Sequence, residues 1–280
     1  MTRAGVLACV LAIAAMQALG AQVPEVRVAA VPEFGAVRPG GAFRVAVRLD
    51  VPDGWYIDWI NPGTTGLPTT LAWTTPAGVS AGPVEWPFPE RHVAGAEVAH
   101  VLRGAVFVLT PFRVEPSARA GVARLRAELT WLLCSTNCIR QRRTASVDVR
   151  IGPGVAARTP AWSQVEAGAG SFPASGEGIT VRAVAAADSV RLEITGLRGA
   201  QPEGALVTFF PAAAGRPAVV VPIQRAGGGV AVVLPATFVA GAPPGRLTGV
   251  LVGVLVRGPT VTSRALAVDA TVAGRERPPQ

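Results

Sequence analysis

An all-β protein with two β-sandwich domains behind an export signal is the fold that this sequence predicts, from three observations. Short stretches that alternate apolar and polar residues recur along the chain, as they do in half-buried strands. The 32 glycines and 25 prolines are spread between these stretches and favour turns. Half of the residues are hydrophobic, so the chain has enough apolar side chains for a sizeable core.

Residues 1–21 predict a secretory signal peptide. Residues 1–3 are a short positive stretch, residues 4–15 are apolar, and residues 18–21 are small enough for a cleavage site. The apolar stretch is too short for a stable anchor. The longest later candidate, residues 247–256, has about half of the roughly 20 residues that a membrane span needs. We therefore expect a periplasmic protein without a membrane span of its own.

Residues 22–152 are expected to form the first sandwich. The segments expected to be extended before the cysteines are residues 25–30, 43–51, 55–60, 71–73, 84–90 and 101–114. Residues 61–69 are rich in turn formers and are expected to be a rigid loop. With the hairpin described next, this gives about seven or eight short strands in roughly 130 residues, which is typical of a β-sandwich.

A β-hairpin is expected to carry both cysteines of the exported chain, since Cys9 lies inside the signal peptide. Alternation places an apolar set on one face of its first strand, Leu125, Ala127, Leu129, Trp131 and Leu133, and a second set on the other, Arg126, Glu128, Thr130 and Cys134. Residues 135–137 form the loop, where Asn137 best tolerates a left-handed conformation, and residues 138–150 return. Cys134 and Cys138 then face each other, roughly at the separation that a disulfide accepts.

The spacing of Cys134 and Cys138 alone allows two interpretations. One is a reversible dithiol/disulfide pair, in which one cysteine forms a mixed disulfide with a partner and the other resolves it. The other is a structural bridge in an exported β domain. Positive charge from Arg140, Arg142 and Arg143 would lower the pKa of a nearby thiol. The alternative for these arginines is a solvated strand face.

The second half of the chain predicts another β-sandwich, at residues 177–274. A linker at residues 153–176 precedes it, with a short helical turn at residues 161–167, and residues 275–280 are expected to be a frayed tail. The expected strands are residues 180–185, 189–194, 205–210, 218–223, 230–234, 247–256 and 265–272. Residues 177–274 contain no cysteine, histidine, tryptophan or tyrosine, so this predicted sandwich offers no obvious reactive site.

Several function classes lack support in the sequence. The net charge of +8 comes from arginines that are scattered along the chain, whereas a nucleic-acid surface concentrates them among aromatics. We find no Ser-His-Asp order, no paired carboxylates and no glycine-rich phosphate loop. His92 and His100 are possible soft-metal ligands beside the cysteines, but they lie far upstream without ligand spacing. We therefore expect neither a metal nor a cofactor.

The aromatic residues of the first half are expected to pack in the core and under loops. They are Trp55, Trp59, Trp73, Trp86 and Trp131. Alternatively, one of them, or Tyr56 or Phe88, shields the cysteine pair. Asn61 is expected to shape its loop and to lie within reach of the cysteine turn.

The first half also resembles a known family. Its motifs are Gly54-Trp55, Trp59-x-Asn61-Pro62-Gly63-x-x-Gly66-Leu67-Pro68-Thr69, Trp73, Trp86-Pro87-x-Pro89, Gly104 and Trp131-Leu132-Leu133-Cys134-x-x-x-Cys138-Ile139. In this order they resemble the periplasmic N-terminal domain of DsbD-type thiol–disulfide interchange proteins, in particular the ScsB-like branch associated with suppression of copper sensitivity. The resemblance covers residues 25–150.

The resemblance implies an immunoglobulin-like domain with a redox-active Cys134–Cys138 pair. This pair would take electrons from a membrane-embedded partner and pass them to periplasmic disulfide proteins, a type of electron transport that serves processes such as cytochrome c biogenesis. The whole chain is then expected to be all-β, with two immunoglobulin-like β-sandwich domains after the signal peptide.

The chain departs from the family pattern in three places. Arg140 and Gln141 replace a proline and an acidic residue, and Leu102 replaces a tyrosine. Family members usually continue into a multi-spanning domain and a thioredoxin-like domain, so here we expect a separate electron donor. The alternative function is a non-enzymatic periplasmic binding module with a structural disulfide, linked to copper tolerance.

Overall fold

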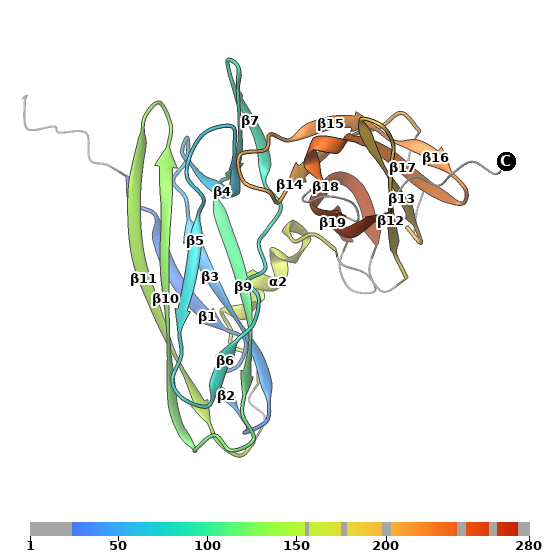
Figure 1. Ribbon diagram of the computed structural model, residues 1–280. Helices are drawn as coiled ribbons and strands as arrows, with labels where there is room; N and C mark the ends of the chain where they lie inside the picture. The colour runs from blue at the N-terminus through green and yellow to red at the C-terminus, as the bar shows by residue number, and fades with distance from the viewer. Residues whose placement is uncertain are drawn as a thin grey trace, which may run out of the picture.

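The chain is almost entirely β, as its alternating pattern predicts (Figure 1). The computed structural model describes residues 24–154, 157–174, 178–197, 203–239, 245–257 and 262–273. The predicted signal peptide, with Cys9, and the predicted tail lie outside these residues. In the described part, α2 (Trp162–Ala167) is the only α-helix, and no helix is long and apolar enough to cross a membrane.

Two sheets pack face to face in the N-terminal half. The four-stranded sheet has the order β1 (Arg27–Pro32), β3 (Ala42–Asp50), β9 (Ala105–Val114) and β6 (Val79–Ala81). The seven-stranded sheet has the order β2 (Ala36–Val37), β11 (Cys138–Ile151), β10 (Gly121–Cys134), β4 (Tyr56–Gly63), β8 (Glu97–Leu102) and β7 (Glu90–Ala94), and β5 (Thr70–Thr74) also pairs with β10. Their inner faces share one apolar core, to which β3 gives Leu49 and β10 gives Trp131.

The long β10–β11 hairpin confirms the predicted alternation. Its ladder runs without interruption from Gly121 opposite Ile151 to Cys134 opposite Cys138. The five residues predicted to face the core are all buried: Leu125, Ala127, Leu129, Trp131 and Leu133.

Two predictions for the segment before this hairpin are wrong. Residues 61–63, expected in a loop, continue β4, because Asn61 and Gly63 are held by neighbouring backbone groups. Residues 101–114, expected as one strand, divide into β8 and β9 at Gly104. The φ of Gly104 is 64°, a conformation that glycine adopts without steric strain because it has no Cβ. The β7–β8 hairpin that results has no clear alternation in sequence.

The C-terminal half forms one eight-stranded sheet that folds over its own core. Its order is β15 (Val219–Pro222), β14 (Leu206–Pro211), β18 (Arg246–Arg257), β19 (Thr262–Ala273), β12 (Thr180–Ala185), β13 (Ser189–Thr195), β17 (Gly229–Pro235) and β16 (Gln224–Ala226). Leu192, Phe209, Leu251 and Leu266 lie in this core. The strands follow the predicted segments, whereas the domain limits at residues 152 and 177 stay a prediction.

The two halves meet at a junction that is apolar with a polar centre. Phe210 and Val250 of the C-terminal sheet join the same buried cluster as Trp59 of β4. At its centre, the Asn61 amide donates to the carbonyls of Pro211 and Arg216, 2.7 and 2.9 Å away. The Asn61 side chain, for which a contact with the cysteine turn was one possibility, is buried at the junction instead.

His100 is the second polar residue of the junction. Its Nε2 accepts from the Ala218 N–H at 2.8 Å, and its Nδ1 lies 2.8 Å from the Asn61 carbonyl, so Nδ1 carries the proton and donates. Burial lowers the pKa of His100 to about 4, which keeps the ring neutral at physiological pH. Because both nitrogens are engaged within the protein, His100 has none left for the metal site that was considered.

Candidate functional site

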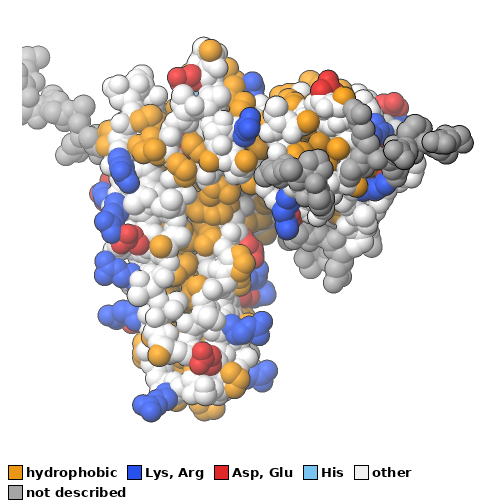
Figure 2. Space-filling view, viewed as in Figure 1, with side chains coloured by type: hydrophobic (Ala, Val, Ile, Leu, Met, Phe, Trp, Pro, Cys, Tyr) orange, Lys and Arg blue, Asp and Glu red, His pale blue; other side chains and the backbone are white. Residues whose placement is uncertain are grey.

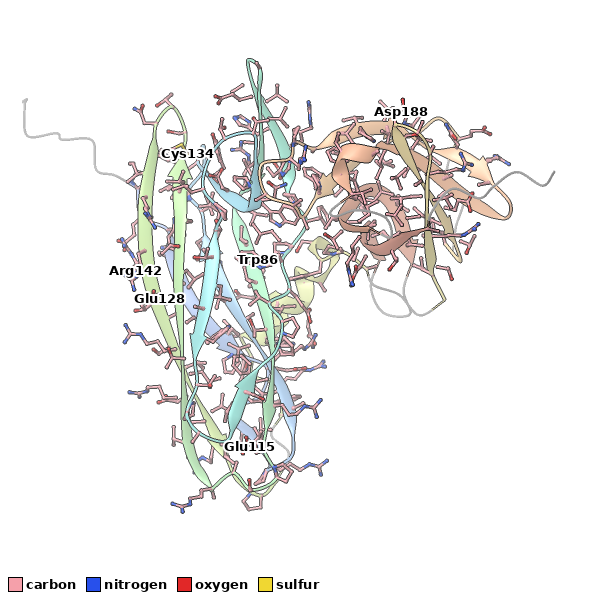
Figure 3. All side chains as sticks on the ribbon, in the orientation of Figure 1. Trp86, Glu115, Glu128, Cys134, Arg142 and Asp188 are labelled. Carbon is pink, nitrogen blue, oxygen red and sulfur yellow. A yellow bond between two sulfur atoms is a disulfide. The ribbon has the colours of Figure 1, made fainter. Side chains whose placement is uncertain are left out.

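The two cysteines form a disulfide at the end of the β10–β11 hairpin. Their Cα atoms are 4.1 Å apart, just below the usual range for disulfides, and the Ser135 N–H donates to the Asn137 carbonyl across the loop. No non-glycine residue in the described part has a positive φ, so the left-handed conformation expected of Asn137 is wrong. Figure 3 shows Cys134 at one end of the sandwich and Glu115 at the other.

The two sulfur-bearing residues differ sharply in exposure. Cys134 is 1% exposed, whereas Cys138 is exposed. The sheet explains the difference, because Cys134 has Cys138 on one side and Tyr56 of β4 on the other. Cys138 has an open side, since β2 pairs with β11 only at the far end, at Arg150 and Ile151. An incoming group therefore reaches Cys138 first.

Tyr56 lies directly opposite Cys134 in the β4–β10 ladder, and its ring contacts side chains of the β7–β8 hairpin and of the residue after it. The Arg103 guanidinium carbon lies 4.8 Å from the centre of the Tyr56 ring, and the His92 ring centre is 4.9 Å away. Glu90 forms a 3.5 Å ion pair with Arg103. Figure 1 shows this hairpin at the same end of the sandwich as the β10–β11 turn. Of the aromatic residues considered as a shield, Tyr56 is the one that lies directly opposite Cys134 in the ladder, and its role as a shield stays a prediction.

Asp58 is a buried acid on the same strand, two residues after Tyr56. Its side chain is 2% exposed, and its Oδ2 accepts the Leu67 N–H at 3.0 Å. Gly66 lets the loop close over it, since a Cβ at Gly66 would lie 2.3 Å from this oxygen. No cation of the described residues lies within ion-pair distance, and burial raises the pKa of Asp58 to about 6.

The arginines after Cys138 do not form one block of free positive charge. Arg142 pairs with Glu128 at 2.5 Å, and Arg143 pairs with Glu25 at 2.9 Å. Arg140 has no ion-pair partner among the described residues, and it lies on the same face of β11 as Cys138. Figure 2 shows cationic side chains spaced along the β10–β11 edge with acidic ones between them. Arg140 is thus the arginine whose charge remains for the disulfide.

The remaining predicted residues lie elsewhere. Trp59 and Trp131 are fully buried in the core, and Trp55, Trp73 and Trp86 pack against it. His92 lies beside Tyr56, and no group of three metal-ligating side chains exists in the described part. Sequence reasoning missed Asp58 and Arg103. The signal for Asp58 was a lone carboxylate within the aromatic segment at residues 55–60.

Comparison with known proteins agrees with this geometry. Residues 22–149 match the sequence profile of the family described as thiol:disulfide interchange protein DsbD, N-terminal. The crystal structure of the N-terminal periplasmic domain of ScsB from Proteus mirabilis is similar over 87% of this chain and 92% of that chain, with a TM-score of 0.52 and 15% identity. This likeness shows the fold, an immunoglobulin-like β-sandwich architecture.

Other similarities are weaker. A type I cohesin from Pseudobacteroides cellulosolvens aligns with 46% of this chain and 94% of that chain, at 13% identity and a TM-score of 0.30, too low to carry an argument. No curated protein sequence matches the chain. Residues 22–149, with the Cys134–Cys138 disulfide at the end of their long hairpin, are therefore similar to the N-terminal domain of DsbD-type thiol:disulfide interchange proteins.

Proposed function

We propose that the protein is a periplasmic thiol–disulfide exchange module, and that Cys134 and Cys138 are its redox-active residues. The observation that carries the proposal is the unequal exposure of the two cysteines at the tip of a hairpin. A reactive disulfide needs one sulfur open to attack and a second that can leave and later return. The electrons come from a membrane-embedded thiol donor and go to an oxidised periplasmic protein, without a cofactor.

The exchange begins at the exposed sulfur. A thiolate of the donor attacks Cys138 Sγ, a new bond to the donor forms, and the Cys134–Cys138 bond breaks with its electron pair on Cys134 Sγ. A second donor thiol then releases Cys138 as the reduced form. In the second half of the cycle, the Cys138 thiolate attacks the acceptor disulfide, and Cys134 resolves the mixed disulfide and closes the bridge again.

A structural bridge at this position would bring little stability. Closing a loop of five residues lowers the entropy of the unfolded chain by an amount worth about 2 kcal/mol, near the lower end for disulfides. The β10–β11 ladder already holds the two strands together along its whole length. The fold therefore has no evident need for the bridge, which favours a redox role.

The second candidate function is a periplasmic binding module with a structural disulfide. Its support is the burial of Cys134 beside strand β4, because a bridge that is packed on one side resists reduction. A link to copper tolerance belongs to this candidate and rests on the ScsB-like motifs.

A reduction potential separates the two functions. The mature protein is equilibrated in graded dithiol buffers, free thiols are alkylated, and the products are counted by mass. We expect a midpoint above about −300 mV, the range of exchangeable disulfides. The Cys134→Ser/Cys138→Ser double variant is the control and should lose only about 2 kcal/mol of stability. A midpoint well below this range, with a larger loss of stability, would support the binding module.

A further inference from the structure

Cys134 Sγ is buried, so water cannot stabilise the negative charge that it receives when the disulfide opens. When the disulfide opens at Cys138, the electron pair is left on Cys134, which is 1% exposed. A thiolate without water around it is unfavourable, and burial raises the pKa of a thiol. A proton donor close to Cys134 would remove this penalty.

Asp58 lies on the strand that covers this sulfur. Tyr56 is directly opposite Cys134 in the β4–β10 ladder, and Asp58 is the next residue on the same face of β4. Asp58 lies one residue past the last β4–β10 pair, Ile57 opposite Leu133. Diagonal neighbours on one face of a sheet are about 7–8 Å apart between backbone positions, so a carboxyl group there can pass a proton to the sulfur through one water molecule.

The burial and the raised pKa of Asp58 fit a proton donor. A buried carboxylate with no cation beside it costs folding free energy, and such groups gather at functional sites. Its pKa, raised to about 6, makes Asp58 an acid that is partly protonated near neutral pH and still stronger than an ordinary thiol. A surface aspartate would already have lost its proton.

We propose that Asp58 is the proton donor and acceptor for Cys134 during exchange. As the sulfur–sulfur bond breaks, the Asp58 carboxyl group gives its proton to the Cys134 thiolate, which leaves a neutral thiol and an aspartate carboxylate. In the reverse direction, the carboxylate takes the proton back, and the Cys134 thiolate attacks the mixed disulfide at Cys138. The inference rests on the proposed exchange function.

Other charged or titratable groups face the same region. Tyr56 lies on β4, Glu97 on β8 with Arg103 directly after its end, and His92 and Glu90 on β7. Glu90 is a carboxylate beside Arg103 that is largely exposed, so it serves as a control for a simple change of charge. Asp58 also accepts the Leu67 N–H, so its test must separate proton transfer from a role in holding the loop.

The isosteric variant Asp58→Asn makes this separation, because its amide oxygen still accepts the Leu67 N–H but carries no exchangeable acid. The rate of disulfide reduction by dithiothreitol is measured from pH 5 to 8 for the wild type, Asp58→Asn and Glu90→Gln. The ratio of rates at each pH cancels the ionisation of dithiothreitol. We expect the wild type to be about tenfold or more faster than Asp58→Asn below pH 6, with the ratio approaching one at pH 8. Glu90→Gln should stay near the wild type throughout.

Each other outcome overturns the inference. If Asp58→Asn is faster than the wild type, Asp58 acts only as a negative charge near the developing thiolate. If it is folded and equally fast at every pH, Asp58 only holds the loop. A wild type that itself resists dithiothreitol at every pH contradicts the exchange function as well.

A second measurement applies if Asp58→Asn does not fold. In the reduced wild type, carbon NMR should show the same two titration steps at the Asp58 carboxyl and at the Cys134 Cβ, as expected for coupled groups. Two independent titrations would contradict a proton transfer between them.

Discussion

The two ends of strand β4 lie in different regions of the molecule. The buried polar side chains of these regions differ in how many of their polar atoms have a partner. Its last residues enter the junction, where Asn61 makes four hydrogen bonds, to two carbonyls and two backbone N–H groups. Its first residues lie beside the disulfide, where Asp58 is buried with the Leu67 N–H as the backbone donor to its carboxylate and no counter-charge in the described part. At one end of β4 the Asn61 amide thus has hydrogen-bond partners for both its oxygen and its nitrogen. At the other end the Asp58 carboxylate is buried without a counter-charge.

The difference teaches how a small sandwich separates rigidity from reactivity. A buried polar network whose members all have partners fixes one arrangement of its neighbours. A buried group that lacks a partner is costly, and such a group persists where its chemistry is used. We therefore expect mutations at the junction to act on stability and mutations at the cysteine end to act on exchange.

The largest effect is expected for the cysteines themselves. In Cys134→Ala the remaining Cys138 thiol is exposed, and in Cys138→Ala the remaining Cys134 thiol is buried. We expect alkylation by iodoacetamide to be on the order of a hundredfold faster in Cys134→Ala, and only this variant to accumulate a mixed disulfide with glutathione. Equal rates at matched pH would mean that the two sulfurs are equally open, and would remove the basis for attack at Cys138.

The next effect is expected at the junction. Asn61→Ala removes the partner of two carbonyls and two N–H groups at the junction, so the free energy of unfolding in urea should fall by about 3 kcal/mol. The rate of reduction by dithiothreitol should not change. Asn137→Ala, at the exposed hairpin loop, is the matched control and should stay within about 0.5 kcal/mol of the wild type. A slower exchange in Asn61→Ala would show that the two regions are coupled.

The sequence predicts the strands and their buried faces better than the contacts between residues far apart in the chain. The alternation in residues 125–133 identifies the strand, its buried face and the cysteine turn, because burial imposes a period of two. Asn61 and His100 owe their roles to residues 211–218, more than 100 positions away, and no local pattern announces such a contact. The unequal exposure of Cys134 and Cys138 depends on which strands flank the hairpin, and this is a property of the sheet order.

The two buried titratable groups predict opposite pH dependences. The pKa of His100 is lowered to about 4, so the unfolded chain binds a proton first, and stability is lost as pH falls from about 6.5 to 4. The pKa of Asp58 is raised to about 6, so the folded protein binds a proton first, and stability is gained over nearly the same range. Each shift corresponds to roughly 3 kcal/mol, and the two nearly cancel.

Single variants should expose this cancellation. Relative to the wild type, Asp58→Asn should lose roughly 3 kcal/mol of unfolding free energy between pH 6.5 and 4, and His100→Gln should gain a similar amount. Using differences from the wild type removes the contribution of Glu33, whose pKa is lowered with the help of the Arg44 guanidinium despite burial. The same pH dependence in both variants would contradict the opposite shifts.

The smallest effect is expected from the charge beside Cys138. Arg140 shares the exposed face of β11 with Cys138 and has no ion-pair partner in the described part, whereas Arg142 is paired with Glu128. At about 7 Å in water, a unit charge contributes roughly 0.6 kcal/mol, so Arg140→Gln should slow alkylation of reduced Cys138 about two- to threefold. The reason is that the pKa of the Cys138 thiol is higher without this charge.

The matched control is Arg142→Gln, which should have a smaller effect because Glu128 already compensates the charge of Arg142. In 1 M salt both effects should disappear, because salt screens exposed charges. A larger effect of Arg142→Gln would mean that the paired arginine, and not Arg140, sets the charge at the cysteine end.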